Sequence, residues 1–163
     1  MDANDRATLL LAYAQGPDQL RQALSGLSPD LLDLRPAPGA WSVREVVAHV
    51  AETELHLYLR TRFALAQPGL TILPFDQDAW AASFEAPGQP LDELVELIRL
   101  LREVLARQLR RLPEAQWLQS VRHPEQERPL TVEALLTKAD QHLKIHLAQV
   151  ARTARAVQGE VAG

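Results

Sequence analysis

The chain has 163 residues, a formal net charge of −4 and no cysteine. This length suits one domain, residues 1–163, with a core that needs no disulfide or metal staple. The charge balance excludes the basic stripe of a nucleic-acid binder, and the lack of cysteine excludes disulfides, thiolate ligands and a thiol nucleophile. Because no apolar run could span a bilayer and the N-terminus is unlike a signal peptide, we expect a cytoplasmic protein without a membrane partner.

The first helix is predicted over residues 4–26, where apolar side chains recur at helical spacing. The dipeptide Gly16-Pro17 interrupts this pattern. Proline lacks a backbone donor and disfavours helix in the residue before it, so we expect a kink or a restart there. A short helical turn is predicted at Ser28-Pro29, with proline at its first helical position.

The second helix is predicted to begin with a capping box, in which Ser42 is the N-cap and Glu45 stands three residues later. It is expected to run to about residue 66. Residues 67–90 contain four prolines and are predicted to be mostly irregular, with one short helix around residues 76–83. A connection of this length is more often functional, or a crossover along a bundle, than idle.

Two further long helices are predicted over residues 90–112 and 131–157. The polar stretch 121–131 between them is expected to be a small hairpin or an ordered loop. We interpret the arginines of the third helix as its solvated face: Arg99, Arg102, Arg107, Arg110 and Arg111. Four long helices without a convincing strand predict an all-α fold, a four-helix bundle with a long connection between helices two and three.

His142 and His146 stand four residues apart on the last predicted helix, so their side chains lie one above the other. That spacing suits chelation of one cation, but such a pair on an arbitrary helix is more often structural or exposed. Both fall within or at the edge of the apolar stripe, where neighbouring side chains offer no partner to an imidazole nitrogen. A metal ion would satisfy two nitrogens at once, and a third ligand would have to come from another helix.

Three other histidines are available as that third ligand. His49 and His56 lie two turns apart on a polar flank of the second helix, which is either a solvent face or one wall of a cleft. His123 stands in the polar stretch before the last helix and is favoured as a plain loop histidine. Spacing alone leaves the choice open.

The stretch WSVREVVAHVAETE, residues 41–54, resembles the signature of the DinB/YfiT-like superfamily. In that signature Trp-Ser opens a helix, and a metal-binding histidine follows seven residues after the serine. Three more stretches resemble the YfiT branch: TILPFDQDAWA at 71–81, HPE at 123–125 and HLKIH at 142–146. Their order and spacing hold from about residue 18 to residue 150. Glu54 and His56 depart from the pattern, which has other polar residues at these positions.

The resemblance implies an up-down-down-up four-helix bundle with a divalent metal, zinc or nickel, held by His49, His142 and His146. It also implies coordination positions kept for water or a small-molecule substrate, which is typical of catalytic rather than structural zinc. Members are described as metal-dependent hydrolases, some resemble S-transferases that use a low-molecular-weight thiol such as bacillithiol, and relatives are often dimers. We therefore expect a homodimeric metal-dependent hydrolase. The alternatives are a thiol S-transferase, a non-catalytic metal-binding stress-response module, and a plain helical interaction protein with its histidines far apart.

Ligating histidines usually donate their other ring nitrogen to a carboxylate, a carbonyl or water. Glu52, one turn from His49, and Asp76 in the long connection are candidates for that role or for a general base. The alternatives are a surface acid for Glu52 and a helix N-cap for Asp76. Trp80 either lines the substrate pocket or anchors the connection on the bundle.

Overall fold

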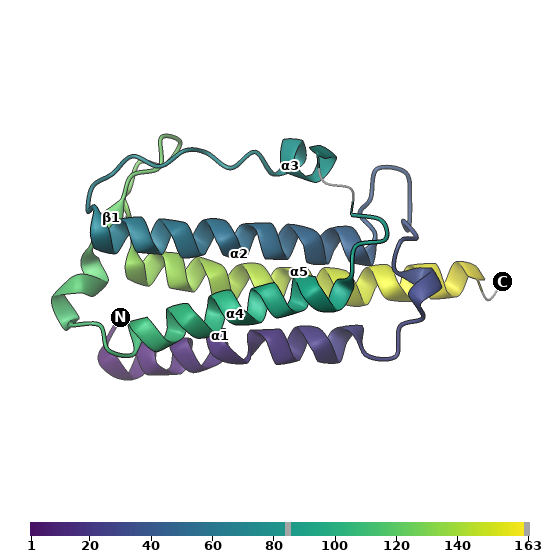
Figure 1. The fold of residues 1–163 in the computed structure, drawn as a ribbon, viewed down its shortest axis with the longest axis horizontal. Coiled ribbons are helices and arrows are strands. Elements are labelled where there is room, and N and C mark those ends of the chain that lie inside the picture. The colour runs from purple at the N-terminus through teal and green to yellow at the C-terminus, as the bar shows by residue number, and fades with distance from the viewer. Residues whose placement is uncertain (84–85, 162–163) are drawn as a thin grey trace.

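Four long helices make up most of the molecule. The computed structural model describes residues 1–83 and 86–161, and its long helices are α1 (Ala3–Leu24), α2 (Val43–Ala66), α4 (Leu91–Leu109) and α5 (Val132–Val161). Figure 1 shows α1 and α5 running one way and α2 and α4 running the other, which confirms the predicted up-down-down-up bundle. Both α1 and α2 pack against α4 and α5, so α1 and α2 lie diagonally opposite.

The connection between α2 and α4 runs back along the outside of α2 (Figure 1). It contains α3 (Gln77–Ser83), which confirms the predicted short helix. Its beginning is fixed to a two-stranded antiparallel hairpin, β1 (Ser120–Val121) and β2 (Leu130–Thr131). The Gly69 amide donates to the Ser120 carbonyl at 2.8 Å, and the Ile72 amide donates to the Arg122 carbonyl at 2.9 Å. The connection is therefore an anchored crossover that lies over α2.

The predicted signals at the helix starts are present in the structure. Ser42 Oγ accepts a hydrogen bond from the Glu45 amide at 3.2 Å, and the Glu45 carboxylate accepts one from the Ser42 amide at 2.8 Å, so the capping box of α2 is formed. The short helix η1 (Pro29–Leu31) begins with proline, as expected. A second short helix, η2 (Glu114–Leu118), joins α4 to the hairpin.

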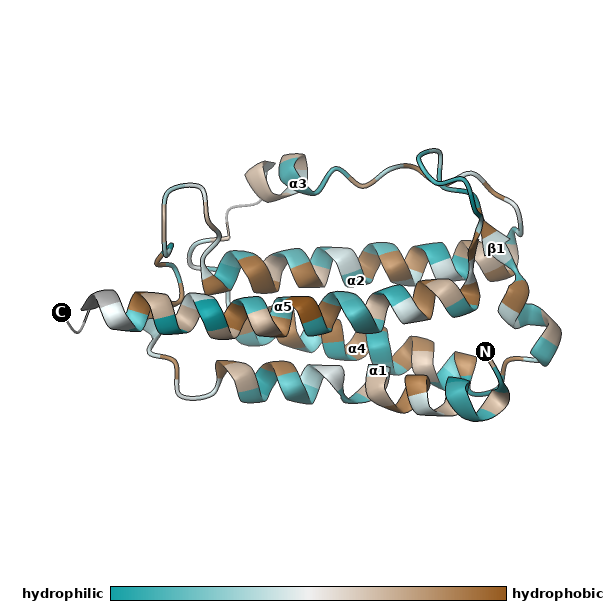
Figure 2. Cartoon of the chain, turned by 180° about the vertical axis from the view of Figure 1, so that it is seen from behind, coloured by the Kyte–Doolittle hydropathy of each residue, from teal (hydrophilic) through white to brown (hydrophobic). Residues whose placement is uncertain are grey.

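Apolar and polar residues alternate at helical spacing along each long helix (Figure 2). The apolar rows face inward, and their described residues form three buried clusters along the bundle. Large side chains that are almost fully buried come from all four helices: Tyr13, Leu20, Val46, Val47, Ile98, Leu109, Leu135 and Leu143. Among the described residues, the helices lack the combination of length and hydropathy that crossing a membrane requires.

Arg102 does not belong to a solvated arginine face, so this part of the prediction was wrong. It is only 1% exposed. The reason is its position four residues after the buried Ile98, in the row of α4 that faces the bundle. Its charge is compensated there by an ion pair with the buried carboxylate of Glu54 on α2. Three other arginines are exposed as predicted: Arg107, Arg110 and Arg111.

The Gly16-Pro17 dipeptide lies inside α1, which is helical across it, so a restart of the helix is not found. Proline cannot donate to the Tyr13 carbonyl, and this carbonyl instead accepts a hydrogen bond from Arg102 Nη1 at 3.0 Å. A Cβ atom at position 16 would overlap Arg102 Nη1 and Leu143 Cδ2. Gly16 therefore leaves space for the buried guanidinium of Arg102, and Pro17 leaves the Tyr13 carbonyl free to accept its hydrogen bond.

We expect Gly16→Ala to lower the free energy of unfolding by about 1–3 kcal/mol, the range for overpacking a filled core. This loss should occur although alanine has the higher helix propensity. Urea denaturation measures it. Gly159→Ala in α5 is the matched control, because no atom lies within 4 Å of a Cβ built there. Equal stability changes in the two variants would contradict the overlap at position 16.

Candidate metal centre

Three histidines from two helices meet on one side of the bundle. His49 lies on α2, and His142 and His146 lie one turn apart on the adjacent α5. Nε2 of His142 is 3.1 Å from Nε2 of His49 and 3.1 Å from Nε2 of His146. One ligand nitrogen from each ring lies within 4.8 Å of the others. The structure thus brings together the three predicted residues, while His123 lies in the hairpin between β1 and β2.

Two of the three separations between these nitrogens fit a divalent cation. Two nitrogens bonded to zinc at about 2.0–2.1 Å stand roughly 2.9 Å apart at a right angle and roughly 3.4 Å apart at the tetrahedral angle. The 3.1 Å separations lie between these limits. By contrast, the single proton or lone pair on Nε2 of His142 can serve only one of its two neighbours. A cation would satisfy all three nitrogens together.

Burial keeps the three imidazoles neutral at neutral pH. It lowers the pKa of His49 to about 4, with a further contribution from the charge of His146. It lowers the pKa of His142 to about 3, to which the charges of His146 and His49 also contribute. The pKa of His146 is lowered by burial too, although a hydrogen bond to Gln149 opposes the shift. Neutral imidazole is the form that binds a metal.

Gln149 orients one of the three rings. Its amide oxygen lies 2.8 Å from Nδ1 of His146. Because that oxygen only accepts, Nδ1 carries the ring proton and Nε2 keeps its lone pair for the centre of the cluster. Sequence reasoning missed Gln149, although its position three residues after His146 on a helix was a usable signal. Within the described part of the chain, Nδ1 of His49 and Nδ1 of His142 are buried without a hydrogen-bond partner.

The metal-free protein should lose stability as the pH falls below 6.5. An unfolded histidine has a pKa near 6.5, whereas folded His49 and His142 have values of about 4 and about 3. Between these values the unfolded chain binds protons that the folded chain does not, so acid favours unfolding. The stabilising contribution is complete above pH 6.5 and declines as the pH falls toward the folded pKa values of about 4 and about 3.

Urea denaturation in the presence of a chelator, at neutral and at mildly acid pH, measures this decline. A His49→Gln/His142→Gln variant is the control, and its stability should depend less on pH over the same interval. A free energy of unfolding that stays constant or rises on acidification would contradict the lowered pKa values.

Of the two candidate carboxylates, Glu52 lies beside the cluster. It is half-buried and lines a small cavity together with His49, and burial raises the pKa of its carboxyl group. It is not the partner of His49 Nδ1, which has none among the described residues. Asp76 is exposed, and its Oδ1 accepts a hydrogen bond from the Ala79 amide at 3.0 Å. Asp76 therefore caps α3, in line with the structural alternative for this residue.

Aromatic rings from two segments lie close to His49 and His56. The ring centroid of Trp41 is 4.9 Å from that of His49. Phe75 lies nearly parallel to the His49 ring at 6.3 Å, and it stacks on His56 at 4.1 Å. Trp80 packs edge-on against His56 at 4.7 Å and against Phe75 at 5.2 Å. Trp80 therefore anchors the crossover on α2 and supports Phe75, whose ring lies nearly parallel to that of His49.

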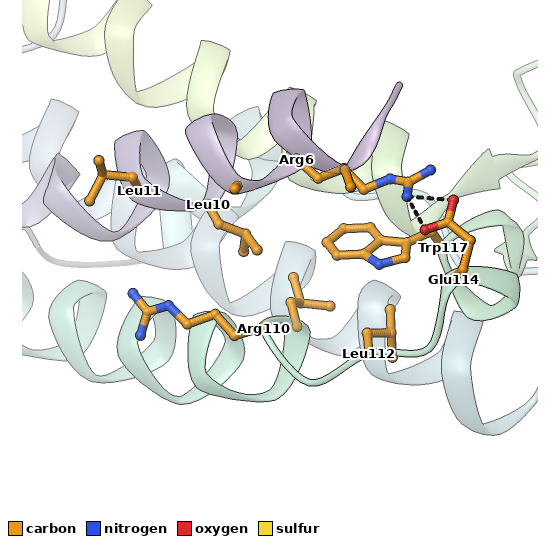
Figure 3. Close-up of a pocket in the computed structure, with 10 residues that line it drawn as sticks. Arg6, Leu10, Leu11, Arg110, Leu112, Glu114 and Trp117 are labelled. Carbon is orange, nitrogen blue, oxygen red and sulfur yellow. Dashed lines mark hydrogen bonds and ion pairs between the residues drawn. The ribbon is translucent and has the colours of Figure 1, made fainter.

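A cavity of about 520 Å³ lies elsewhere, between the start of α1 and the end of α4 (Figure 3). Trp117 and leucine side chains line it, and no histidine is among its lining residues in the described part of the chain. Arg6 at its edge forms ion pairs with two carboxylates, those of Glu114 at 2.6 Å and Glu133 at 3.1 Å. This cavity lacks the donor set of a metal centre, which only the histidine cluster supplies among the described residues.

A four-helix bundle with converging histidines on two adjacent helices defines a class of helical proteins with a candidate metal centre. Comparison with known proteins assigns the family: the model of the DinB superfamily matches residues 12–150. The chain belongs to the DinB superfamily.

Its relatives are bacterial proteins of similar size. The chain is 31% identical over 135 residues to a protein of Geobacillus kaustophilus, covering 83% of this chain and 76% of that one. It is 27% identical over 139 residues to YfiT of Bacillus subtilis, covering 85% and 78%. Both relatives carry the name "Putative metal-dependent hydrolase". Together with the histidine cluster, these relatives point to a divalent metal.

Two solved structures share the fold. YfiT from Bacillus subtilis, described as having an unusual four-helix bundle topology, matches with a TM-score of 0.88 at 24% identity, over 95% of this chain and 89% of that one. A mycothiol-dependent maleylpyruvate isomerase matches with a TM-score of 0.67 at 18% identity, over 87% of this chain and 59% of that one. At these identities the likeness establishes the fold alone, and the chemistry has to be inferred from the residues of the site.

Proposed function

We propose that this protein is a divalent-metal-dependent enzyme that hydrolyses a small molecule. The observation that supports this most directly is the convergence of three neutral Nε2 atoms, with that of His142 lying 3.1 Å from those of His49 and His146. Three protein ligands leave coordination positions for water and substrate, whereas structural zinc is normally closed by four. The names of the relatives agree with this reaction class.

The metal is proposed to be zinc or nickel, since imidazole ligands suit both ions. When bound, the cation would supply Lewis acidity to a substrate oxygen. We propose Glu52 as the proton acceptor, because it shares a cavity with His49 and because burial raises the pKa of its carboxyl group. Trp41 and Phe75 lie beside the His49 ring, at centroid distances of 4.9 Å and 6.3 Å, and would border a bound substrate.

A second candidate is the transfer of a low-molecular-weight thiol, such as bacillithiol, to an electrophile. The chain has no cysteine, so any thiol has to arrive with a cosubstrate. The shared bundle of the mycothiol-dependent isomerase favours this candidate at the level of fold. In this reaction Glu52 would take the thiol proton.

Metal analysis of the purified protein, followed by two assay panels, tests these proposals. We expect one divalent ion per cluster, and activity that is lost with a chelator and restored by zinc or nickel. Hydrolysis of esters or amides supports the first candidate, and conjugation of bacillithiol to electrophiles supports the second. Protein that binds neither ion contradicts both. Protein that unfolds on metal removal and is inactive in both panels would instead be a non-catalytic metal-binding module.

A further inference from the structure

The ion pair of Glu54 and Arg102 lies at the centre of the bundle and joins all four long helices. Both side chains are at most 1% exposed. The Arg102 fork, on α4, donates through Nη2 to the Glu54 carboxylate on α2 and to the Ala139 carbonyl on α5, the latter at 3.0 Å. Through Nη1 it donates to the Tyr13 carbonyl on α1 at 3.0 Å. The Tyr13 hydroxyl donates to the second Glu54 oxygen at 3.3 Å.

This pair ties together the same two helices that contribute the histidine cluster. Glu54 stands five residues after His49 on α2. Ala139 stands three residues before His142 on α5. The guanidinium of Arg102 therefore connects the α2 turn that follows His49 to the α5 turn that precedes His142.

The α5 turn at this point is held from a second direction. Leu143, the residue after His142, packs where a Cβ atom at position 16 would stand, so Gly16 forms a notch for it. Within this turn the Ala139 carbonyl is held by the guanidinium and the Leu143 side chain by α1. Both contacts limit sliding and rotation of α5 at the position of His142.

Stability alone is a poor reason for such an arrangement. A buried ion pair is often no more stabilising than apolar side chains of similar volume, because both charges lose their hydration. In addition, α1 lacks one backbone hydrogen bond at Pro17 and has no side chain at Gly16, where the guanidinium packs. What the pair adds is fixed geometry, since the planar guanidinium reaches several acceptors at set angles, which a lysine ammonium does not.

We propose that the Glu54–Arg102 pair is a positioning device, which fixes the α5 turn of residues 139–143 against α2 and so holds His142 and His49 at the separation that a shared cation requires. The inference rests on the proposed metal-dependent function. Glu54 and Arg102 are positioning residues, since they act on the cluster through the helix backbones.

The test replaces the pair by apolar residues of similar size, in Glu54→Leu/Arg102→Met. Removing both charges leaves no buried unpaired ion, so the fold should persist. In metal-free crystals we expect the distance between Nε2 of His49 and Nε2 of His142 to widen well beyond 3.1 Å. Affinity for added Zn²⁺ should fall about 10–100-fold, the range found when groups that orient ligands are removed. The absorption spectrum of the Co²⁺-loaded variant should change with the coordination geometry.

Arg6→Met is the matched control, since it removes another nearly buried arginine that joins α1 to α5 through Glu133. It should leave the Nε2 separation, the Zn²⁺ affinity and the Co²⁺ spectrum unchanged. If the double variant does not fold, Arg102→Lys takes its place, because it keeps the charge opposite Glu54 and removes only the planar fork.

An unchanged Nε2 separation and Co²⁺ spectrum in the folded variant would overturn the positioning role. Wild-type protein that binds no Zn²⁺ would instead overturn the proposed function. In that case the Nε2 separation in metal-free crystals still decides whether the pair positions the cluster.

Discussion

Glu54→Ala is expected to lower the free energy of unfolding by about 3–5 kcal/mol, because it leaves the guanidinium of Arg102 buried without a counter charge. Arg102 is 1% exposed and lies between four helices, so it cannot reach water by a change of rotamer alone. The Tyr13 hydroxyl loses its acceptor in the same variant. Urea denaturation, with the slope checked for two-state behaviour, measures the effect.

Glu103→Ala is the matched control for this variant. Its carboxylate pairs with Arg99 on the outside of α4 and is about half exposed, so its loss should cost no more than about 1 kcal/mol. Glu54→Leu/Arg102→Met should recover much of the stability that Glu54→Ala loses, since it removes both charges. A loss in Glu54→Ala as small as that in Glu103→Ala would show that Arg102 finds another partner or solvent.

The helices of this fold could be predicted from local signals. Periodicity located all four long helices, and the capping box at Ser42 and the prolines after residue 66 marked the ends of α2. The predicted crossover was less obvious, because nothing in residues 67–90 says which helix they cover. Their attachment to the hairpin depends on backbone hydrogen bonds about 50 residues apart in sequence, which no local pattern reveals.

The candidate site divides in the same way. The spacing of His142 and His146 is a local signal on one helix. No local signal favours His49 over His56, because both lie on one flank of α2. Only the position of α2 along the axis of α5 decides which of the two reaches His142. Resemblance to a family supplied His49, and the structure places it beside the pair. Phe75 was missed as a neighbour of His49 because it comes from the crossover.

The burial of Arg102 could not be predicted from any local sequence pattern. Five arginines within thirteen residues, in and just after α4, suggest a solvated face, and four of them lie outside the core. The fifth, Arg102, lies in the inward-facing row and is paired with Glu54, a carboxylate 48 residues away on another helix, which no local pattern reveals. The sequence predicts a kink or a restart at Gly16-Pro17 for a related reason: Arg102, which uses the freed carbonyl of Tyr13, is 89 residues away. Pairs of this kind become visible only once the bundle is assembled.

His142→Ala is expected to weaken the binding of a divalent metal by more than about 100-fold, beyond the 10–100-fold range for groups that only orient ligands. Nε2 of His142 is the central atom of the cluster, 3.1 Å from each of the other two. Without it, the two remaining nitrogens stand on different helices with no shared neighbour. His49→Ala and His146→Ala should weaken binding too, but each leaves one close pair of nitrogens in place.

His56→Ala is the matched control for this loss. It removes the same type of side chain from the same flank of α2 as His49, and it lies against Phe75 and Trp80 rather than in the cluster. Competition with a chromogenic chelator measures metal affinity, and circular dichroism verifies that each variant is folded. His56→Ala should retain the wild-type affinity. If His142→Ala also retained it, the bound ion would occupy another part of the chain, and the three converging imidazoles would be a structural cluster.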